Sequence, residues 1–376
     1  MKILMLSKAL VVGTYQRKAE ELAALPDVDL TVAVPPTWIE PGVGTLTLEQ
    51  RYTTGYRMAV LPMWLNGHFH VHFYPGLKRL VELIKPDIFH IDEESFNFAT
   101  FQAMQLGVQH RARCCFYNWA NIERRYPPPF STFEHYTLKH AAAAIAGNHE
   151  AAAIIQRHGY DGPIHVLPQF GVDPDLFYPA ATPPDSEADQ AFRIGYFGRM
   201  VESKGVLDLI EALAQLPSFV QLLLIGDGEL LPKIEARIVE LDLHERVTIR
   251  PRVPSGDVPQ EMRRLHAFVL PSRTTPRWKE QFGRVLIEAM ASGVPPVGSN
   301  SGEIPHVIAD AGLIFQEGDS TDLAAKLRLL IEQPDLRAEL ARIGRARALD
   351  HYTQRALARS YYQVYQQMLD GQISAV

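Results

Sequence analysis

The chain has 376 residues, of which 47% are hydrophobic, 21% charged and 9% aromatic, a balance typical of a soluble globular protein that is long enough for two domains. The formal net charge of -6 excludes a general electrostatic attraction to nucleic acid, so we expect no nucleic-acid partner. Cys114 and Cys115 are the only cysteines, and because adjacent cysteines do not bridge easily, the sequence indicates neither a disulfide scaffold nor a zinc site.

The cysteine usage favours a reducing cytoplasm, and we expect a cytoplasmic protein. The apolar start of the chain predicts a first strand rather than a secretion signal, because Ser7 and Lys8 interrupt it. No apolar stretch approaches the roughly 20 residues that a transmembrane helix needs. Any membrane contact is therefore expected to be peripheral, at the inner face.

The first half of the chain alternates short apolar runs with longer helical patterns, which is typical of parallel sheets covered by helices on both faces. Such sheets bind ligands at the carboxyl ends of their strands. Helices are predicted at 17–25 and 132–140, and strands are predicted at 2–6, 30–34, 87–91, 113–116, 143–146 and 164–167.

A segment rich in proline and acidic residues, 176–190, lacks apolar periodicity and predicts the domain linker. A second strand-and-helix series follows it. Its predicted strands are 192–197, 221–225, 267–270 and 295–298, with a helix at 204–216 and another that begins near Phe282. The last periodic segment, 350–369, predicts an amphipathic helix that carries four tyrosines.

Three histidines, His68, His70 and His72, alternate at the period of a strand. Histidines on one face can bind a metal, but no nearby cysteine or carboxylate completes a site. The favoured interpretation is a strand or hairpin with a polar face, and no metal site is expected.

The strongest chemical signal is the run EQFGRVLIE, Glu280 to Glu288, which follows an apolar strand and enters a helix. Free backbone N–H groups at Phe282, Gly283 and Arg284 are expected to hold phosphate oxygens at the helix start. Glu280 can accept hydrogen bonds from hexose hydroxyls and Glu288 from a ribose. An ordinary buried helix with two surface glutamates remains the alternative on spacing alone.

The E-x7-E spacing, the following EAMASG and GEIP segments, and GYFGRMVESKG from Gly195 onward resemble the retaining family 4 glycosyltransferases. That resemblance implies an α/β protein of the GT-B fold, with two facing Rossmann-like, doubly wound domains and an interdomain cleft. It implies an acceptor domain over 1–175 and a nucleotide-sugar donor domain over 176–355. The helix 356–376 is expected to pack back on the N-terminal domain.

The resemblance also assigns donor-binding residues. Arg199 and Lys204 match the paired cations of the donor diphosphate, where fixed positive charge stabilises the leaving group. Arg252 and Val253 match the pair that contacts the nucleobase, and Gly13 matches a loop glycine that lets the backbone approach the donor. The full expected donor set is Gly13, Arg199, Lys204, Arg252, Val253, Glu280, Gln281, Phe282, Gly283 and Glu288.

One position departs from the family pattern. Relatives carry H-x-H-E where this chain has HIDEE, so that His90 matches the first histidine and Asp92 the second. Asp92 is expected to accept from the transferred sugar or to stabilise positive charge at the anomeric carbon, as carboxylates do in other glycosyl chemistry. His90 is expected to be a packed strand residue. Asp92, Glu280, Arg199 and Lys204 form the expected catalytic set.

Acceptor contacts are expected from Glu93, which follows Asp92, and from Arg124 and Arg125, which would suit an anionic acceptor such as a lipid-linked phosphate.

The resemblance implies transfer of a hexosyl group from a UDP- or GDP-sugar to an acceptor hydroxyl, with retention and without a metal or other cofactor. The expected acceptor is a saccharide, a lipid-linked glycan or a small molecule. A catalytically silent nucleotide-sugar-binding partner of another transferase is the main alternative. A sugar-nucleotide epimerase or a phosphorylase on the same architecture fits less well. A dinucleotide oxidoreductase is disfavoured because no G-x-G-x-x-G opens the first helix.

Overall fold

The computed structural model describes residues 1–40, 43–181, 191–254 and 256–371. The chain divides into two compact units, the first made of Met1–Phe170 and Gln354–Val376 and the second of Gly171–Thr353. The division between Phe170 and Gly171 lies ahead of the linker expected at 176–190, of which residues 182–190 lie outside the described residues.

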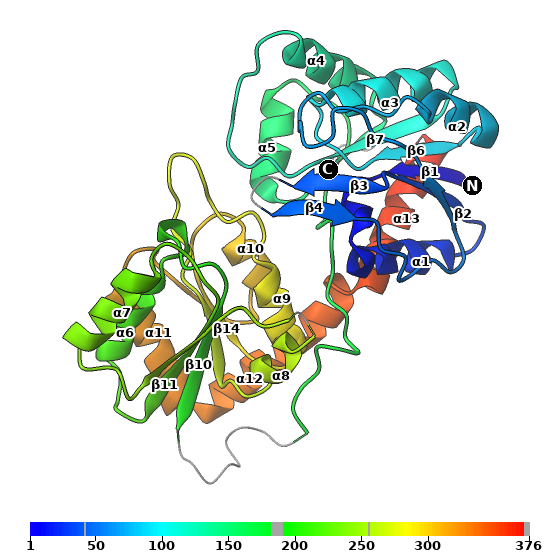
Figure 1. The fold of residues 1–376 in the computed structure, drawn as a ribbon. Helices are drawn as coiled ribbons and strands as arrows, with labels where there is room; N and C mark the ends of the chain where they lie inside the picture. Colours follow the sequence, from blue (N-terminus) through cyan, green and yellow to red (C-terminus); the bar gives the residue numbers. More distant parts are fainter. Residues whose placement is uncertain (41–42, 182–190, 255, 372–376) are drawn as a thin grey trace. The chain divides into compact units, whose positions relative to one another are not determined.

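The first unit is built on a seven-stranded parallel sheet in the order β5-β2-β1-β6-β7-β8-β9 (Figure 1). A short antiparallel hairpin, β3-β4, follows β2. The strands are β1 (Lys2–Leu6), β2 (Asp29–Val34), β3 (Thr37–Glu40), β4 (Gly44–Thr47), β5 (Arg57–Val60), β6 (Ile88–Ile91), β7 (Arg113–Asn118), β8 (Ala143–Ala146) and β9 (Ile164–Val166). The helices are α1 (Arg17–Ala23), α2 (Leu77–Ile84), α3 (Phe98–Gln109), α4 (Phe130–His140), α5 (His149–Arg157) and α13 (Gln354–Asp370).

The two faces of this sheet bury separate cores, because successive side chains of a strand point to opposite faces. Ile3 and Met5 of β1 pack in one core with residues of α1 and α13. Leu4 and Leu6 pack in the other core with residues of α2 and α3. The continuous apolar run that predicted β1 is thus explained by burial on both sides.

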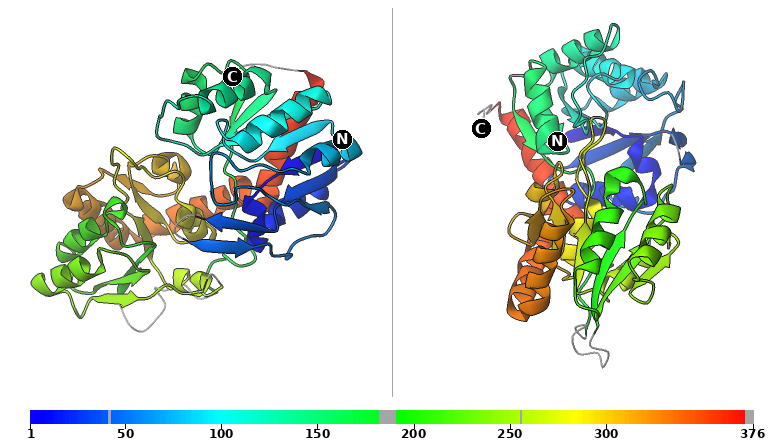
Figure 2. Two further views of the ribbon diagram at one scale, coloured as in Figure 1. Left: turned by 45° about the horizontal axis from the view of Figure 1, so that its top comes forward. Right: turned by 90° about the vertical axis from the view of Figure 1, so that its left-hand side faces the viewer.

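Helix α13 belongs to the first unit although it ends the described chain, and it lies beside α1 (Figures 1 and 2). Its residues Tyr361 and Tyr365 are fully buried. The sequence predicted one helix over 350–369. The structure instead ends a preceding helix at His351 and begins α13 at Gln354, so Tyr352 caps the earlier helix.

The second unit is a six-stranded parallel sheet in the order β12-β11-β10-β13-β14-β15. Its strands are β10 (Phe192–Phe197), β11 (Val220–Ile225), β12 (Val247–Arg250), β13 (Ala267–Leu270), β14 (Pro296–Ser299) and β15 (Leu313–Phe315). Its helices are α6 (Val206–Ala214), α7 (Leu231–Glu240), α8 (Val258–Met262), α9 (Arg284–Ala291), α10 (Ile304–Ile308), α11 (Ser320–Glu332) and α12 (Pro334–His351).

The histidine segment was predicted as a strand or hairpin with a polar face, and the structure shows a hairpin-like turn segment in which the three histidines do not share one face. Trp64 and Phe73 form an isolated antiparallel bridge, and the residues between them make turns, with Leu65 and Gly67 at positive φ. The turns send the histidines into different surroundings: His68 is exposed, His70 is half-buried and His72 is fully buried. Within the described residues, no helix is long and apolar enough to cross a bilayer.

A glycine-bearing turn after β11 supports the neighbouring loop after β10. Gly226 and Gly228 have φ of +147° and +155°, and a Cβ on either residue would meet a backbone oxygen, that of Gly198 at 1.9 Å or that of Met200 at 2.3 Å. The two segments are joined by the Met200 N–H, which donates to the Asp227 carbonyl over 2.6 Å. The glycines therefore permit a close backbone approach that fixes the loop carrying Arg199.

We predict that Gly226→Ala lowers the free energy of unfolding by about 3 kcal/mol, because the added Cβ strains the backbone and forces the two loops apart. Urea denaturation measures this difference. Gly256→Ala is the matched control, since a Cβ there meets nothing within 4 Å. Equal stability of the two variants would contradict the packing described for this turn.

Candidate active site

In each unit, polar residues gather where the strand order reverses, at the carboxyl ends of the strands. Such switch points open a crevice between neighbouring loops and bind ligands in doubly wound sheets. In the second unit the switch lies between β10 and β13, which are followed by the loops that carry Lys204 and Glu280. In the first unit it lies between β1 and β6, which are followed by Ser7 and Asp92.

Lys204 and Glu280, predicted from distant segments of the sequence, form an ion pair in the second unit. Lys204 Nζ lies 2.6 Å from Glu280 Oε2, and Ser272 Oγ donates to the same oxygen over 2.8 Å. The ammonium also lies 4.5 Å from the centre of the Trp278 ring. Both side chains are mostly buried, at 16% and 10% exposure, so solvent screens the pair only in part. The structure thus brings these two predicted residues into one cluster.

Helix α9 begins two residues later than predicted, because Gly283 before it is left-handed with φ +77°. Glu288 therefore lies about one turn into the helix. Its carboxylate is buried and accepts from Arg284 Nε over 3.1 Å. Burial raises the pKa of Glu288, against the lowering effect of Arg284. The Phe282 side chain is buried and packs edge-to-face against Tyr352. Its backbone is therefore the part of the residue that can contact a ligand.

The remaining predicted donor residues of this unit lie on surface loops. Arg199 and Gln281 are exposed, Arg252 is exposed, and Val253 is half-buried in the loop after β12. The Tyr196 hydroxyl donates to the Arg199 carbonyl over 2.7 Å, which fixes the backbone under that cation. Their roles in donor binding stay predictions.

Asp92 is nearly buried at the end of β6, where two neutral groups hold its carboxylate. Ser7 Oγ donates to Oδ2 over 2.5 Å, and Gln169 Nε2 donates to Oδ1 over 2.8 Å. Gln169 also accepts at its backbone oxygen from buried Lys18 over 2.8 Å. Burial lowers the pKa of Lys18 to about 8, against the raising effect of Asp92. The carboxylate is thus fixed in orientation while a cation lies behind it.

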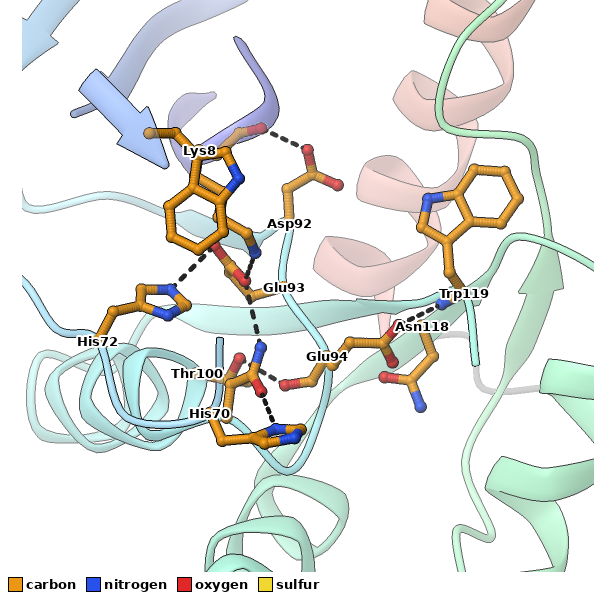
Figure 3. A network of polar contacts seen from close by, with 12 residues as sticks. Lys8, His70, His72, Asp92, Glu93, Glu94, Thr100, Asn118 and Trp119 are labelled. Carbon is orange, nitrogen blue, oxygen red and sulfur yellow. Dashed lines mark hydrogen bonds and ion pairs between the residues drawn. The ribbon is translucent and has the colours of Figure 1, made fainter. Parts of the chain in front are cut away.

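Glu93, the next residue, forms an ion pair with Lys8 and lies 3.4 Å from His72 Nε2 (Figure 3). Asn97 Nδ2 donates to the same carboxylate over 3.3 Å. Burial alone would raise the pKa of Glu93. The charges of Lys8 and His72, together with their hydrogen bonds to the carboxylate, outweigh burial and lower the pKa to about 2. Glu93 therefore stays ionised.

Glu94 is buried in a different environment. Its Oε1 accepts from the backbone N–H groups of Trp119, over 2.9 Å, and Ala120, over 3.2 Å (Figure 3). Its Oε2 has no hydrogen-bond partner among the described residues. Burial raises the pKa of Glu94 to about 7, because the two amides and Lys8 offset only part of the desolvation cost. This carboxyl group exchanges its proton near neutral pH.

His90 is a packed strand residue, as expected. Its ring stacks on Tyr361 at 5.4 Å, and its Nδ1 lies 2.5 Å from the Tyr365 hydroxyl. Burial lowers its pKa well below the usual value, so it stays neutral.

The backbone of Gly13, predicted to approach the donor, contacts the chain's own Glu49. The Gly13 N–H donates to Glu49 Oε2 over 2.9 Å, and a Cβ on Gly13 would lie 2.5 Å from that oxygen. The close contact with Glu49 therefore explains why a glycine is required at this position. The contact of Gly13 with a donor stays a prediction.

Arg124 and Arg125 are exposed on the loop between β7 and α4. Neither lines the cavity that Asp92, Glu93 and Glu94 share. Their predicted role toward an anionic acceptor has no support from this cavity.

Several residues that build the first unit's site had no specific role in the sequence analysis, where Lys8 and Lys18 were expected only to add positive potential or solubility and His72 was weighed only as a metal ligand. The full set is Ser7, Lys8, Lys18, His72, Glu94, Trp119 and Gln169. Five of them lie within three residues of the carboxyl end of a strand of the parallel sheet, and that position was the available signal. Lys18 and His72 lie on α1 and in a turn, where only the three-dimensional packing reveals their partners.

Two parallel-sheet units, each with polar residues at its switch point, define the GT-B class of protein, and the comparisons agree. Anabaena HepE, solved in complex with UDP, superposes with a TM-score of 0.74 at 20% identity, covering 98% of this chain and 100% of that one. Residues 182–347 match the family described as Glycosyl transferases group 1. Over that region the chain is similar to this glycosyltransferase family, which confirms the recognition of a glycosyltransferase drawn from the sequence motifs.

Curated relatives match over part of their length. The capsular polysaccharide biosynthesis glycosyltransferase CapM of Staphylococcus aureus is 30% identical, over 47% of this chain and 47% of the relative. A GDP-mannose-dependent phosphatidylinositol monomannoside mannosyltransferase of Mycolicibacterium smegmatis is 30% identical, over 48% of this chain and 51% of the relative. The chain therefore spans about half the length of the curated relatives it matches.

We predict that Glu94→Gln changes how stability depends on pH. The pKa of Glu94 is about 7 in the folded protein and 4.5 ordinarily, so the folded state binds more protons than the unfolded state between these values. Glu94 therefore contributes to the free energy of unfolding below pH 4.5. This contribution, up to about 3 kcal/mol, is lost as the pH rises through 7.

The amide oxygen of the substituted side chain can still accept from both backbone N–H groups, but the amide does not titrate. Urea unfolding at pH 5 and pH 8 should show that the wild type loses stability relative to the variant as the pH rises. Parallel pH profiles for the two proteins would refute the assigned environment of Glu94.

Proposed function

We propose that this chain is a retaining, metal-independent glycosyltransferase that moves a hexosyl group from a UDP- or GDP-sugar to an acceptor hydroxyl. The second unit binds the donor and the first unit binds the acceptor. The observation that carries the proposal is the pairing of Lys204 with Glu280 directly ahead of α9, at the switch point of the second unit.

The chemistry of transfer fits this pair. The anomeric C–O bond to the diphosphate breaks, a bond from the acceptor oxygen to the same carbon forms, and the acceptor's proton passes to a leaving-group oxygen. Negative charge therefore grows on the diphosphate, and a fixed ammonium such as that of Lys204 stabilises it more in the transition state than in the ground state. Exposed Arg199 adds a second cation. Glu280 both positions Lys204 and can accept from hexose hydroxyls.

The names of the similar proteins support the same class of donor. HepE was solved with UDP, and the mycobacterial relative is described as GDP-mannose-dependent. We therefore propose a UDP- or GDP-sugar, and a role in polysaccharide or glycolipid assembly as for CapM.

The proposal predicts that one nucleotide sugar raises the melting temperature of the purified protein within a panel of UDP-, GDP- and ADP-sugars. A ligand at 100 times its Kd stabilises the folded state by about 2.7 kcal/mol. The shift should be the same with EDTA, since no metal is required.

Lys204→Ala should abolish most of that shift, whereas Lys233→Ala, which removes an exposed lysine of α7, should retain it. The absence of a shift with every nucleotide sugar, or an unchanged shift in Lys204→Ala, would refute the donor site. A shift that EDTA removes would refute metal independence.

A further inference from the structure

Asp92, Glu93 and Glu94 of the first unit border a cavity of about 460 Å³, which Glu40 also lines. A cavity of this size holds a small organic molecule. Its walls are mainly apolar and include Val11, Tyr15, Trp38, Phe69, Trp119 and Phe170. Tyr15 and Phe170 stack with their ring centres 3.8 Å apart. The cavity therefore offers broad, flat apolar surfaces beside a polar floor.

Most polar groups of this floor already have a partner within the chain. The Trp119 indole donates to Gln169 Oε1 over 2.7 Å, and the Tyr117 hydroxyl donates to the Leu167 carbonyl over 2.9 Å. Lys8 is paired with Glu93, as described above. A ligand with many hydroxyls would have to replace these bonds, whereas an apolar ligand leaves them intact.

The carboxyl groups supply acceptor positions for a hydroxyl of the ligand. Asp92 accepts one hydrogen bond at each oxygen in the structure, and each oxygen of a carboxylate can accept a second. Glu94 adds an oxygen that has no partner among the described residues.

The charge of the lining selects against anions. Among the residues that the structure describes, the cavity is bordered by one cation, Lys8, and by the carboxyl groups of Glu40, Asp92, Glu93 and Glu94. A phosphate or carboxylate on the ligand would face like charge in a partly desolvated space, which is unfavourable.

We propose that this cavity holds the acceptor of the transfer reaction, and that the acceptor is an uncharged, largely apolar alcohol or phenol whose hydroxyl reaches Asp92. The proposal rests on the proposed function and names the class of its second substrate. The flat part of the acceptor lies against Tyr15, Phe69, Trp119 and Phe170, where aromatic surfaces give the most burial per contact. Arg124 and Arg125 take no part.

Three probes of similar bulk test this proposal by equilibrium dialysis against the purified full chain, without any donor. They are 2-naphthalenemethanol, which is neutral and apolar, 2-naphthoate, which has the same ring but a negative charge, and methyl α-glucoside, which is neutral and rich in hydroxyls. We expect the alcohol to bind with a Kd at least about tenfold below those of the other two.

Two variants locate the binding. Phe170→Ala and Phe69→Ala should each weaken binding of the alcohol about tenfold, because each removes part of the aromatic wall. Phe219→Ala is the matched control, since Phe219 is an exposed phenylalanine of the second unit. Circular dichroism checks that each variant is folded.

Equal or tighter binding of 2-naphthoate would overturn the proposal in favour of an anionic acceptor, and tighter binding of the glucoside would favour a saccharide. Failure of the alcohol to bind, or binding that Phe219→Ala weakens as much as Phe170→Ala does, would also overturn it. None of these results changes the nucleotide-sugar shift described above, so the two proposals fail independently.

Discussion

The reversal of strand order within each parallel sheet is the constraint on which this protein depends. Because β1 lies between β2 and β6, and β10 between β11 and β13, the loops that leave these strands diverge and expose their backbone and first side chains. Residues far apart in sequence meet there: Ser7 contacts Asp92 in the first unit, and Lys204 contacts Glu280 in the second. The helices that bury both faces of the sheets keep these loops at fixed positions.

The polar clusters of the two units differ in their balance of charge, and we propose that they bind different substrates. In the second unit a mostly buried ammonium is balanced by one carboxylate, and under the proposed function it meets the donor diphosphate. In the first unit carboxyl groups outnumber cations around an apolar cavity. Adjacent glutamates there differ in protonation: ion pairing keeps Glu93 charged, whereas burial allows Glu94 to take up a proton near pH 7.

The sequence predicted the strands well where the apolar run was continuous, as in β1, β10 and β13, because burial on both faces leaves a strong local pattern. The E-x7-E spacing identified Glu280, and the GRMVESKG loop identified Lys204. Their direct contact follows only from the crossover of β10 and β13, which no local pattern encodes. The prediction for the histidine segment was poorer because its period-two pattern does not reflect a strand: the residues between Trp64 and Phe73 form turns, and the three histidines differ in burial.

The site of the first unit, which we propose binds the acceptor, was harder to predict because packing brings its residues together. Arg124 and Arg125 are conspicuous in the sequence but exposed in the structure, whereas Tyr15 and Phe170 come from distant segments and form one wall. Glu94 carries no signal in the sequence that separates it from Glu93. Its pKa differs because burial raises it, and the amides of Trp119 and Ala120 and the charge of Lys8 offset only part of that effect, whereas Glu93 forms a direct ion pair with Lys8.

The measurement that tests the central claim most directly is product formation by the purified chain. The protein would be incubated with its stabilising nucleotide sugar and an apolar alcohol, and the products would be analysed by mass spectrometry. The account predicts a product that carries one added hexosyl group, and a rate about 100-fold lower in Glu280→Gln, which keeps the Ser272 hydrogen bond but loses the ion pair with Lys204. A wild-type protein that binds the nucleotide sugar and yet transfers nothing to any acceptor would contradict it and identify a silent nucleotide-sugar-binding partner instead.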